Sequence, residues 1–222
     1  MKKRNYKYAA VLFLSGASCL FSACGQNSDK TSTTSQEEQT MADHNMGDGG
    51  ASSNKMMDLM HENMTDMQKV QMTGDPDHDF ALLMAVHHEG ALTMAQEQVD
   101  AGKDTALVNI AKATLLMQKE EIDRLQKFAD AQKNSTGDTA KTMRMMAPMK
   151  DMMTQMNHNT KGGTDHHFAT LMSLHHQSGI DMAKAYIPMA KSVEIKAMAQ
   201  KIINDQQKEK QLLDNWLKQN NL

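Results

Sequence analysis

From about residue 55 onward, the apolar residues of the chain recur with the period of an α-helix. In two long segments, beginning near residues 77 and 165, they fall at i, i+4, i+7, i+11 and i+14, along one face of a helix. No segment alternates apolar and polar residues over a sustained stretch, so the pattern predicts an all-α fold without a sheet. The periodic positions are Phe80, Met84, His87, Ala91 and Met94 in the first segment, and Phe168, Met172, His175, Gly179 and Met182 in the second.

Residues that start or stop helices mark the boundaries. Asp75-Pro76 has the order expected of an N-cap followed by proline in the first turn, and Gly102 ends the helix that begins there. Asp104 caps the next helix. In the second half, the corresponding long helix is expected to end before Pro188, and Ser192, 88 residues after Asp104, caps the last helix.

The two long segments are copies of one motif. Asp77 to Ala95 and Asp165 to Ala183 each hold an Asp-His start, a Phe three residues in, a Met, a His-His pair and then Met-Ala, at a spacing of 88 residues. The folded region, 55–222, is therefore predicted to contain two repeats, 55–133 and 142–220. Each is an αα-hairpin preceded by a short Met-rich helix, and two such hairpins pack most simply as a four-helix bundle, with six helices in all.

Methionines line the short helix before each hairpin. Their spacing predicts a helical stripe, which either packs against the bundle or offers thioether ligands to a soft metal. Pro148, inside the second stripe, is expected to kink or delay that helix. The stripes are Met57, Met60, Met64 and Met67 in the first repeat, and Met146, Met149, Met153 and Met156 in the second.

The start of the chain has the pattern of an export signal. Basic residues, an apolar run from Ala9 to Phe21 and small residues before Cys24 predict a signal peptide over residues 1–23. Phe21 to Cys24 also resembles a bacterial lipobox. That resemblance implies lipidation of Cys24 and a lipoprotein anchored in a membrane of the cell envelope, facing the periplasm or the cell exterior.

Residues 24–54 are polar and are predicted to form a disordered tether. Within this tether, Met41, His44 and Met46 are either a chance cluster in a Met-rich protein or a loose motif that captures soft metal ions.

The composition narrows the function. A net charge of −3 gives no basic surface for nucleic acid. The chain has 23 Met and 10 His but only 2 Cys, both within the first 24 residues, so the folded part carries thioethers and imidazoles without thiols. Such ligands favour copper, particularly Cu(I), and they persist in an oxidising envelope where thiols form disulfides.

Each hairpin places a His pair opposite a carboxylate. His87-His88 and His175-His176 lie on or beside the apolar face, and one Glu interrupts the apolar stripe of each partner helix. A buried carboxylate is costly unless it is paired or bound to metal. The partner stripes are Ile110, Thr114, Met117, Glu121, Leu125 and Phe128, and Met198, Ile202, Asp205, Glu209, Leu213 and Trp216, with Gln118 and Gln206 on a neighbouring face.

Three interpretations of these side chains stay open. They form a buried network that only specifies the bundle of a structural or interaction lipoprotein, they bind copper, or they form a ferritin-type di-iron centre. The di-iron centre needs Glu-x-x-His motifs, and the sequence has none. Hydrolytic triads and phosphate loops are also missing, so we expect a binding protein rather than an enzyme.

The copper interpretation assigns specific ligands. Cu(I) is the favoured ion, with Ag(I) and Cu(II) left open, and a homodimer is left open too. Glu121 and Glu209 are expected to orient the imidazoles, with direct ligation left open. The predicted ligands are first Met84, His87, His88, Met172, His175 and His176, and second Asp77, His78, Asp165, His166 and His167 at the helix starts.

The chain from about residue 55 to its end resembles the DUF305 family. The resemblance rests on a Met-x-x-His-His core followed by Met-Ala, in Phe80 to Ala95 and again in Phe168 to Ala183, each followed by a helix with Gln-x-x-Glu. It implies a secreted, ferritin-like helical bundle, in a family that includes CopM-type periplasmic proteins that bind copper through Met and His. Where the family usually has Ile-Pro before the His pair, this chain has Ala85-Val86 and Ser173-Leu174. The expected role is to bind or buffer copper in the bacterial envelope, for copper tolerance.

Overall fold

A computed structural model describes residues 51–132, 136–156 and 162–220 of the chain. Every regular element in these ranges is helical, which confirms the predicted all-α fold. The predicted signal peptide, the lipidation site Cys24, the cluster around His44 and nearly all of the tether lie outside the described residues.

The first half consists of a short helix and a long hairpin. Asp75 caps the second helix by accepting hydrogen bonds from the backbone N–H groups of Asp77 and His78, and Gly102 follows its last turn. Asp104 caps the third helix in the same way, through the N–H of Leu107. The helices are α1 (Ala51–Gln68), which begins four residues before the predicted start at 55, α2 (Pro76–Ala101) and α3 (Thr105–Ala131).

The second half repeats this order, but its short helix is interrupted. Pro148 lies in the first turn of α5, where its missing N–H costs no helical hydrogen bond, and a 3-10 turn precedes it. The sixth helix ends before Pro188, and Ser192 caps the last one. The elements are α4 (Thr139–Thr142), η1 (Met143–Met146), α5 (Ala147–Gln155), α6 (Thr164–Tyr186), η2 (Ile187–Met189) and α7 (Val193–Gln219).

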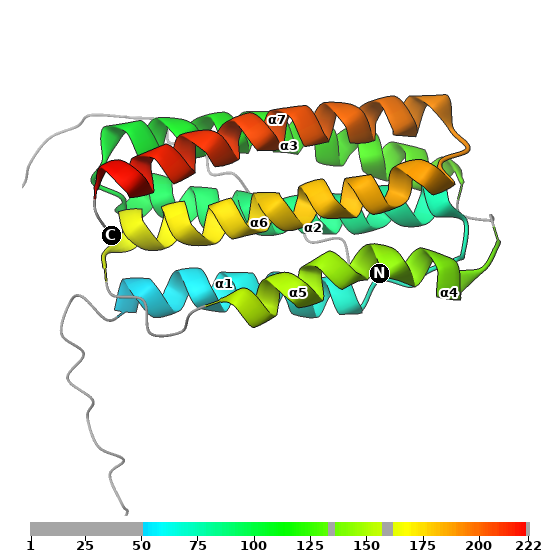
Figure 1. Cartoon of the computed structure of the whole chain (residues 1–222), viewed down its shortest axis with the longest axis horizontal. Helices are drawn as coiled ribbons and strands as arrows, with labels where there is room; N and C mark the ends of the chain where they lie inside the picture. Colours follow the sequence, from blue (N-terminus) through cyan, green and yellow to red (C-terminus); the bar gives the residue numbers. More distant parts are fainter. Residues whose placement is uncertain (1–50, 133–135, 157–161, 221–222) are drawn as a thin grey trace, which may run out of the picture. The chain divides into compact units, whose positions relative to one another are not determined.

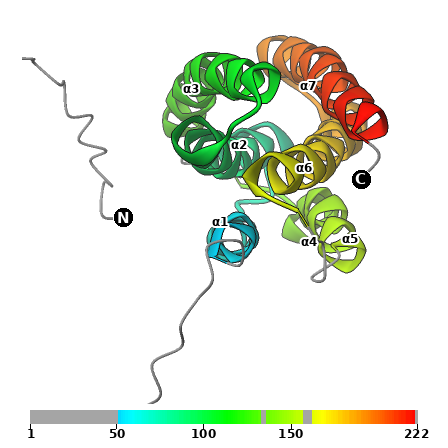
Figure 2. The ribbon, with the colours of Figure 1, turned by 90° about the vertical axis from the view of Figure 1, so that its left-hand side faces the viewer.

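The hairpins α2–α3 and α6–α7 pack together mainly through α2 and α6, giving the predicted four-helix bundle (Figure 1). Helix α1 packs against α2 and α6, and α5 packs against α6, on the side away from α3 and α7 (Figure 2). Because α2 and α6 are covered on two sides, they bury residues around most of their circumference, whereas α3 and α7 each bury one stripe. None of the helices that the structure describes is both long and apolar enough to cross a membrane.

The buried methionine faces match the predicted stripes in part, since Met57, Met60, Met67, Met149 and Met156 are buried. Met64, Met146 and Met153 are only partly buried. The helices are rotated so that the neighbouring line of residues faces α2 and α6. Asn63 belongs to this line, and its Nδ2 donates to the carbonyl oxygen of Val86 at 2.7 Å. In and around these short helices, the methionines less than 7% exposed are Met56, Met60, Met67, Met145, Met149, Met152 and Met156.

A close approach of two backbones fixes the loop before α2. Gly74 has φ 86°, a conformation that favours glycine, and a Cβ there would lie 2.2 Å from the carbonyl carbon of Gly137. The Gly137 N–H donates to the carbonyl oxygen of Thr73 at 2.9 Å. These contacts join the start of α2 to the segment before α4.

Candidate metal centre

The two His pairs meet in the middle of the bundle. The His87 ring of α2 stacks on the His175 ring of α6, with centroids 3.8 Å apart and planes 15° apart. His88 and His176 stand beside them, and all four imidazoles are fully buried. Because α2 and α6 run antiparallel, equivalent residues of the two repeats face each other here. The primary predicted ligands are thus brought to one region, with Met84 and Met172 buried one turn earlier on their helices.

Hydrogen bonds fix the tautomers of the stacked rings. Nε2 of His175 lies 3.1 Å from the carbonyl oxygen of His87, so it must carry a proton and donate. Nε2 of His87 lies 3.0 Å from Oγ of Ser178, whose hydroxyl donates to the carbonyl oxygen of His175 at 2.7 Å. Since that hydroxyl has one hydrogen, His87 Nε2 is the donor to Ser178 Oγ. Each ring therefore keeps a lone pair on Nδ1.

Burial holds the stacked rings in the neutral form. Loss of solvent lowers the pKa of His87 well below 6.5, and the nearby imidazoles of His175, His88 and His176 lower it further. The pKa of His175 is lowered well below 6.5 in the same way, by burial and by His176 and His88. The Nδ1 lone pairs of both rings thus stay available to a metal ion in mildly acidic surroundings.

His88 belongs to a chain of polar contacts that reaches the surface at Lys201. Its Nε2 donates to Oε2 of Glu121 at 2.9 Å, and Nζ of Lys201 lies 2.8 Å from both Oε1 of Glu121 and Oδ2 of Asp205. Burial acts to raise the pKa of the Glu121 carboxyl, but the contacts with His88 and Lys201 outweigh it and hold that pKa below its usual value. This contact leaves Nδ1 of His88 without a partner among the described residues, and the role of Glu121 in orienting a metal ligand stays a prediction.

His176 has a less regular contact with its glutamate. Its Nε2 lies 2.8 Å from Oε2 of Glu209, but the N–H direction does not point at the oxygen, so the contact lacks hydrogen-bond geometry. Thr114 Oγ1 lies 3.2 Å from the same oxygen. The other oxygen of Glu209, Oε1, has no partner among the described residues.

Several donor atoms in this region are buried without partners in the described part of the chain. A metal bound here would satisfy them, because the Nε2 atoms of His87, His88 and His175 are anchored on acceptors while Nδ1 stays bare, the arrangement usual for metal-binding histidines. No three His, Cys, Asp or Glu side chains in the described ranges are placed to hold an ion together, so a site here needs thioether ligands. The atoms without partners that have a lone pair to offer are Nδ1 of His87, His88, His175 and His176, and Oε1 of Gln118 and Gln206.

The glutamines were placed wrongly by the sequence pattern. Gln118 and Gln206 are each 3% exposed and belong to the buried stripe, whereas Met117, predicted to be on it, is 38% exposed. Polarity is the reason, because a glutamine inside an apolar stripe looks like a solvent-facing residue. The signal that would have found them is the same Gln-x-x-Glu order in both repeats.

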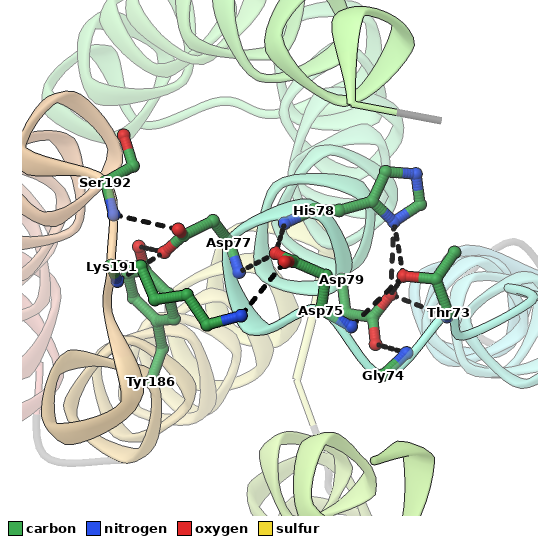
Figure 3. A network of polar contacts seen from close by, with 9 residues as sticks. All are labelled: Thr73, Gly74, Asp75, Asp77, His78, Asp79, Tyr186, Lys191 and Ser192. Atoms are coloured by element: carbon green, nitrogen blue, oxygen red, sulfur yellow. Dashed lines mark hydrogen bonds and ion pairs between the residues drawn. The ribbon is translucent and has the colours of Figure 1, made fainter. Parts of the chain in front are cut away.

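Asp77 accepts hydrogen bonds at the bundle end, away from the His pairs. Tyr186 donates its hydroxyl at 2.5 Å, and the backbone N–H groups of Lys191 and Ser192 donate at 3.0 and 2.8 Å (Figure 3). Burial and this contact with Asp77 raise the pKa of the Tyr186 hydroxyl, which stays protonated. The carboxylate thus holds the loop between α6 and α7.

Asp165 makes the same contacts at the opposite end. It accepts from Nε2 of Gln98 at 2.6 Å and from the backbone N–H groups of Lys103 and Asp104, both at 3.1 Å. Each of these three donors stands 88 residues before its counterpart at Asp77. We call these two groups of contacts the Asp clasps. Gln98 and Tyr186 were missed from the sequence because their side chains differ, although the spacing was available.

The remaining predicted ligands also lie at the helix starts. His78 Nδ1 is 3.1 Å from Oδ1 of Asp79, which also accepts from the backbone N–H of Thr73 at 2.8 Å (Figure 3). In α6, His167 Nδ1 donates to the carbonyl oxygen of Gly163 at 2.8 Å. His166 Nδ1 has no partner in the described residues, and burial lowers its pKa.

The predicted ligands therefore fall into three groups rather than one. About ten residues of helix, or about 15 Å, separate each helix start from its His pair. Because α2 and α6 are antiparallel, Asp77 and His78 lie at one end of the bundle, and Asp165, His166 and His167 lie at the other.

Comparisons with known proteins agree with this fold. A solved structure titled "CopM in the Ag-bound form (by soaking)" superimposes with a TM-score of 0.51 at 20% sequence identity, covering 67% of this chain and 98% of that one. No curated protein matches the sequence. The sequence model of the domain of unknown function DUF305 matches twice, at residues 25–129 and 128–217. Because the two matches together span most of the chain and follow its two halves, this protein belongs to the DUF305 family.

Proposed function

We propose that the protein binds a soft monovalent ion of the copper group, Cu(I) or Ag(I), at His87, His88, His175 and His176, which we call the His centre. One observation carries this proposal. His87, His88 and His175 each fix their Nε2 proton on an acceptor and keep a buried, bare Nδ1. Neutral imidazole nitrogens are ligands for copper, and the buried thioethers of Met84 and Met172 add soft sulfur.

The ligand chemistry favours the monovalent ion. Thioethers prefer Cu(I) to Cu(II), and neither thioether nor neutral imidazole loses a proton on binding. The fold neighbour CopM was solved with silver, which is consistent with this class of ion. Glu121 fits the role of orienting His88. Asp77 and Asp165 accept hydrogen bonds in the Asp clasps at the bundle ends, so we do not include them among the ligands of this site.

The proposed role is binding and buffering rather than catalysis. A site filled by protein ligands has no open position for a substrate, in contrast to catalytic metal sites. The predicted export signal and the lipobox-like Cys24 support the further proposal that the protein is anchored by lipid in the bacterial envelope, where it would sequester copper for copper tolerance.

This function is tested by measuring the Cu(I) affinity of the full chain in competition with a Cu(I) chelator, under anaerobic conditions. Changing His87, His88, His175 and His176 to Gln is expected to weaken the tightest site at least about 100-fold. A matched control, His78→Gln with His166→Gln, removes histidines at the helix ends and is expected to change affinity less than about threefold. Equal affinity of the core variant and the wild type would overturn the proposal.

If the four-His variant does not fold, a double variant in the methionines still tests the site. Met84→Leu and Met172→Leu keep the volume of the core and remove only sulfur. They are expected to weaken Cu(I) at least about tenfold while far-ultraviolet circular dichroism stays unchanged. Unchanged Cu(I) affinity in this folded variant would contradict a site that uses thioethers.

A structural role is the second candidate. The contacts from Nε2 of His88 through Glu121 to Lys201 form without any metal, as in a network that only specifies the bundle. In that case the four-His variant would lose stability, and Cu(I) affinity would match that of the tether alone.

A further inference from the structure

A cleft between α5 and α6 leads from the surface towards the His centre. The two helices pack together, and the cleft between them has a volume of about 160 Å³. Met152 and Ser178 line it and are each 3% exposed, so they form its floor. Asp151, Gln155 and Asp181 line it from more exposed positions and form its mouth.

The floor of the cleft touches the His centre. Oγ of Ser178 accepts a hydrogen bond from Nε2 of His87 at 3.0 Å, and Sδ of Met149 lies 3.3 Å from the same oxygen. Met149 is fully buried and lies one turn before Met152 on α5. The side chains between the cleft and His87 thus include two thioethers, which bind soft metal ions without losing a proton.

At the equivalent place in the first half, a side chain fills the space. Ser178 corresponds to Gly90, 88 residues earlier, and Met152 corresponds to Asn63, since the buried line of α1 recurs 89 residues later. Asn63 packs directly on the backbone of Gly90, where an added Cβ would lie 2.3 Å from its Cγ. Nδ2 of Asn63 also donates to the carbonyl oxygen of Val86 at 2.7 Å. A methionine cannot make this hydrogen bond, so Met152 does not fasten α5 to α6 in the same way.

We infer that this cleft is the route by which the soft monovalent ion enters and leaves the His centre. The inference rests on the proposed function, because a route needs a site at its end. The four imidazoles are fully buried, so an ion must pass between helices to reach them. Asp151 and Asp181 draw a cation to the mouth, although Lys184, 3.3 Å from Asp181, offsets part of this charge. Further in, the sulfur of Met152 favours a soft ion over a hard one.

The rate at which Cu(I) leaves the loaded protein tests the route. The full chain, loaded with one equivalent of Cu(I) under anaerobic conditions, is mixed with a coloured Cu(I) chelator in such excess that the rate no longer depends on it. Gln155→Trp adds bulk at the mouth and is expected to slow release at least about fivefold, while the Kd for Cu(I) changes less than about twofold. A blocked route slows entry and exit together, whereas loss of a ligand raises the Kd.

Two matched pairs of variants control the measurement. Thr154→Trp carries the same bulk on the neighbouring residue of α5, which is exposed and does not line the cleft, and should release Cu(I) at the wild-type rate. Asp151→Asn removes a charge from the mouth, and we expect the capture rate constant, which is the release rate divided by the Kd, to fall at least about twofold at low salt. Glu62→Gln, at the repeat position of Asp151 in α1, should leave it unchanged.

The outcomes separate the route from the site. Equal release from Gln155→Trp and wild type overturns the route, and so does equal slowing by Thr154→Trp, because bulk anywhere on α5 would then be the cause. If Gln155→Trp does not fold, Asp151→Asn decides, and a capture rate constant equal to that of Glu62→Gln overturns the route. Equal Cu(I) affinity of wild type and the four-His variant instead overturns the proposed function, and the route with it.

Discussion

The Asp clasps at the bundle ends are the same in both halves, whereas the His–Glu pairs at the centre are not. Asp77 and Asp165 each accept one side-chain and two backbone hydrogen bonds from the opposite hairpin, at positions 88 residues apart. At the centre, Glu121 has Lys201, whereas Glu209 has no equivalent lysine among the residues that the structure describes. The clasps hold the hairpins together, a task that both ends share equally. The centre is where the repeats have diverged, and we place the chemistry there.

The symmetry of the clasps has a physical basis. A short loop between two helices leaves N–H groups that no helix satisfies, and both hairpins have such a loop. A carboxylate in the first turn of the neighbouring helix accepts from these groups and is itself stabilised by the helix dipole. Asp77 and Asp165 occupy that turn in α2 and α6.

The largest expected effect is on the clasp at Asp77. Asp77→Ala leaves the buried Tyr186 hydroxyl and two loop N–H groups without their acceptor, so we expect a loss of about 3 kcal/mol in the free energy of unfolding. Asp165→Ala, at a less buried carboxylate, is expected to cost about 2 kcal/mol. Urea unfolding of the metal-free protein measures both.

A further variant, Asp77→Asn, separates the role of the clasp from metal binding. If Asp77 only holds the loop, Asp77→Asn leaves Cu(I) affinity unchanged while it lowers stability. A variant that keeps its stability but loses Cu(I) would restore Asp77 as a metal ligand, as the sequence alone suggested.

Much of the fold was predictable because helix signals are local. Asp75, Asp104 and Ser192 cap helices as predicted, and the long helices end at Gly102 and before Pro188. The period of the apolar residues then placed the His pairs on the buried faces. These predictions needed only the chain geometry within one helix.

The predictions that failed depended on how the helices pack. Met56 and Met57 are equally apolar, and only the rotation of α1 against α2 and α6 decides which one is buried deeper. The clasps were missed because most of their donors are backbone N–H groups, which every residue except proline has. The contact between Lys201 and Glu121 joins residues 80 positions apart on different hairpins, so no local pattern reveals it.

The centre should also make stability depend on pH. Burial lowers the pKa of His87 and His175 well below 6.5. Below pH 6.5 both imidazoles are therefore protonated in the unfolded chain but stay neutral in the folded protein. Stability therefore falls as the pH drops below about 6.5 and is level above it. Since each histidine contributes up to about 1.4 kcal/mol per pH unit, we expect a loss of about 2 kcal/mol between pH 7 and pH 5.5.

Urea unfolding across this pH range tests the expectation, with the double variant His87→Gln and His175→Gln as the comparison. Carboxyls with a lowered pKa, such as Glu121 and Asp79, also destabilise the protein in acid, but only nearer pH 4. The double variant should therefore lose most of the slope above pH 5.5. If the double variant keeps the same slope of unfolding free energy against pH, the slope comes from histidines outside the centre.

The smallest expected effect concerns the charge that distinguishes the two halves. Lys201→Ala makes Glu121 resemble Glu209, and because Lys201 is about half exposed we expect a loss of only about 1 kcal/mol, reduced by salt. Lys208→Ala is the matched control. Lys208 lies 3.5 Å from Asp205 at the surface and is 75% exposed, so its removal is expected to cost less than about 0.3 kcal/mol. If both variants lose the same stability, the contact of Lys201 with the buried Glu121 contributes no more than a surface ion pair.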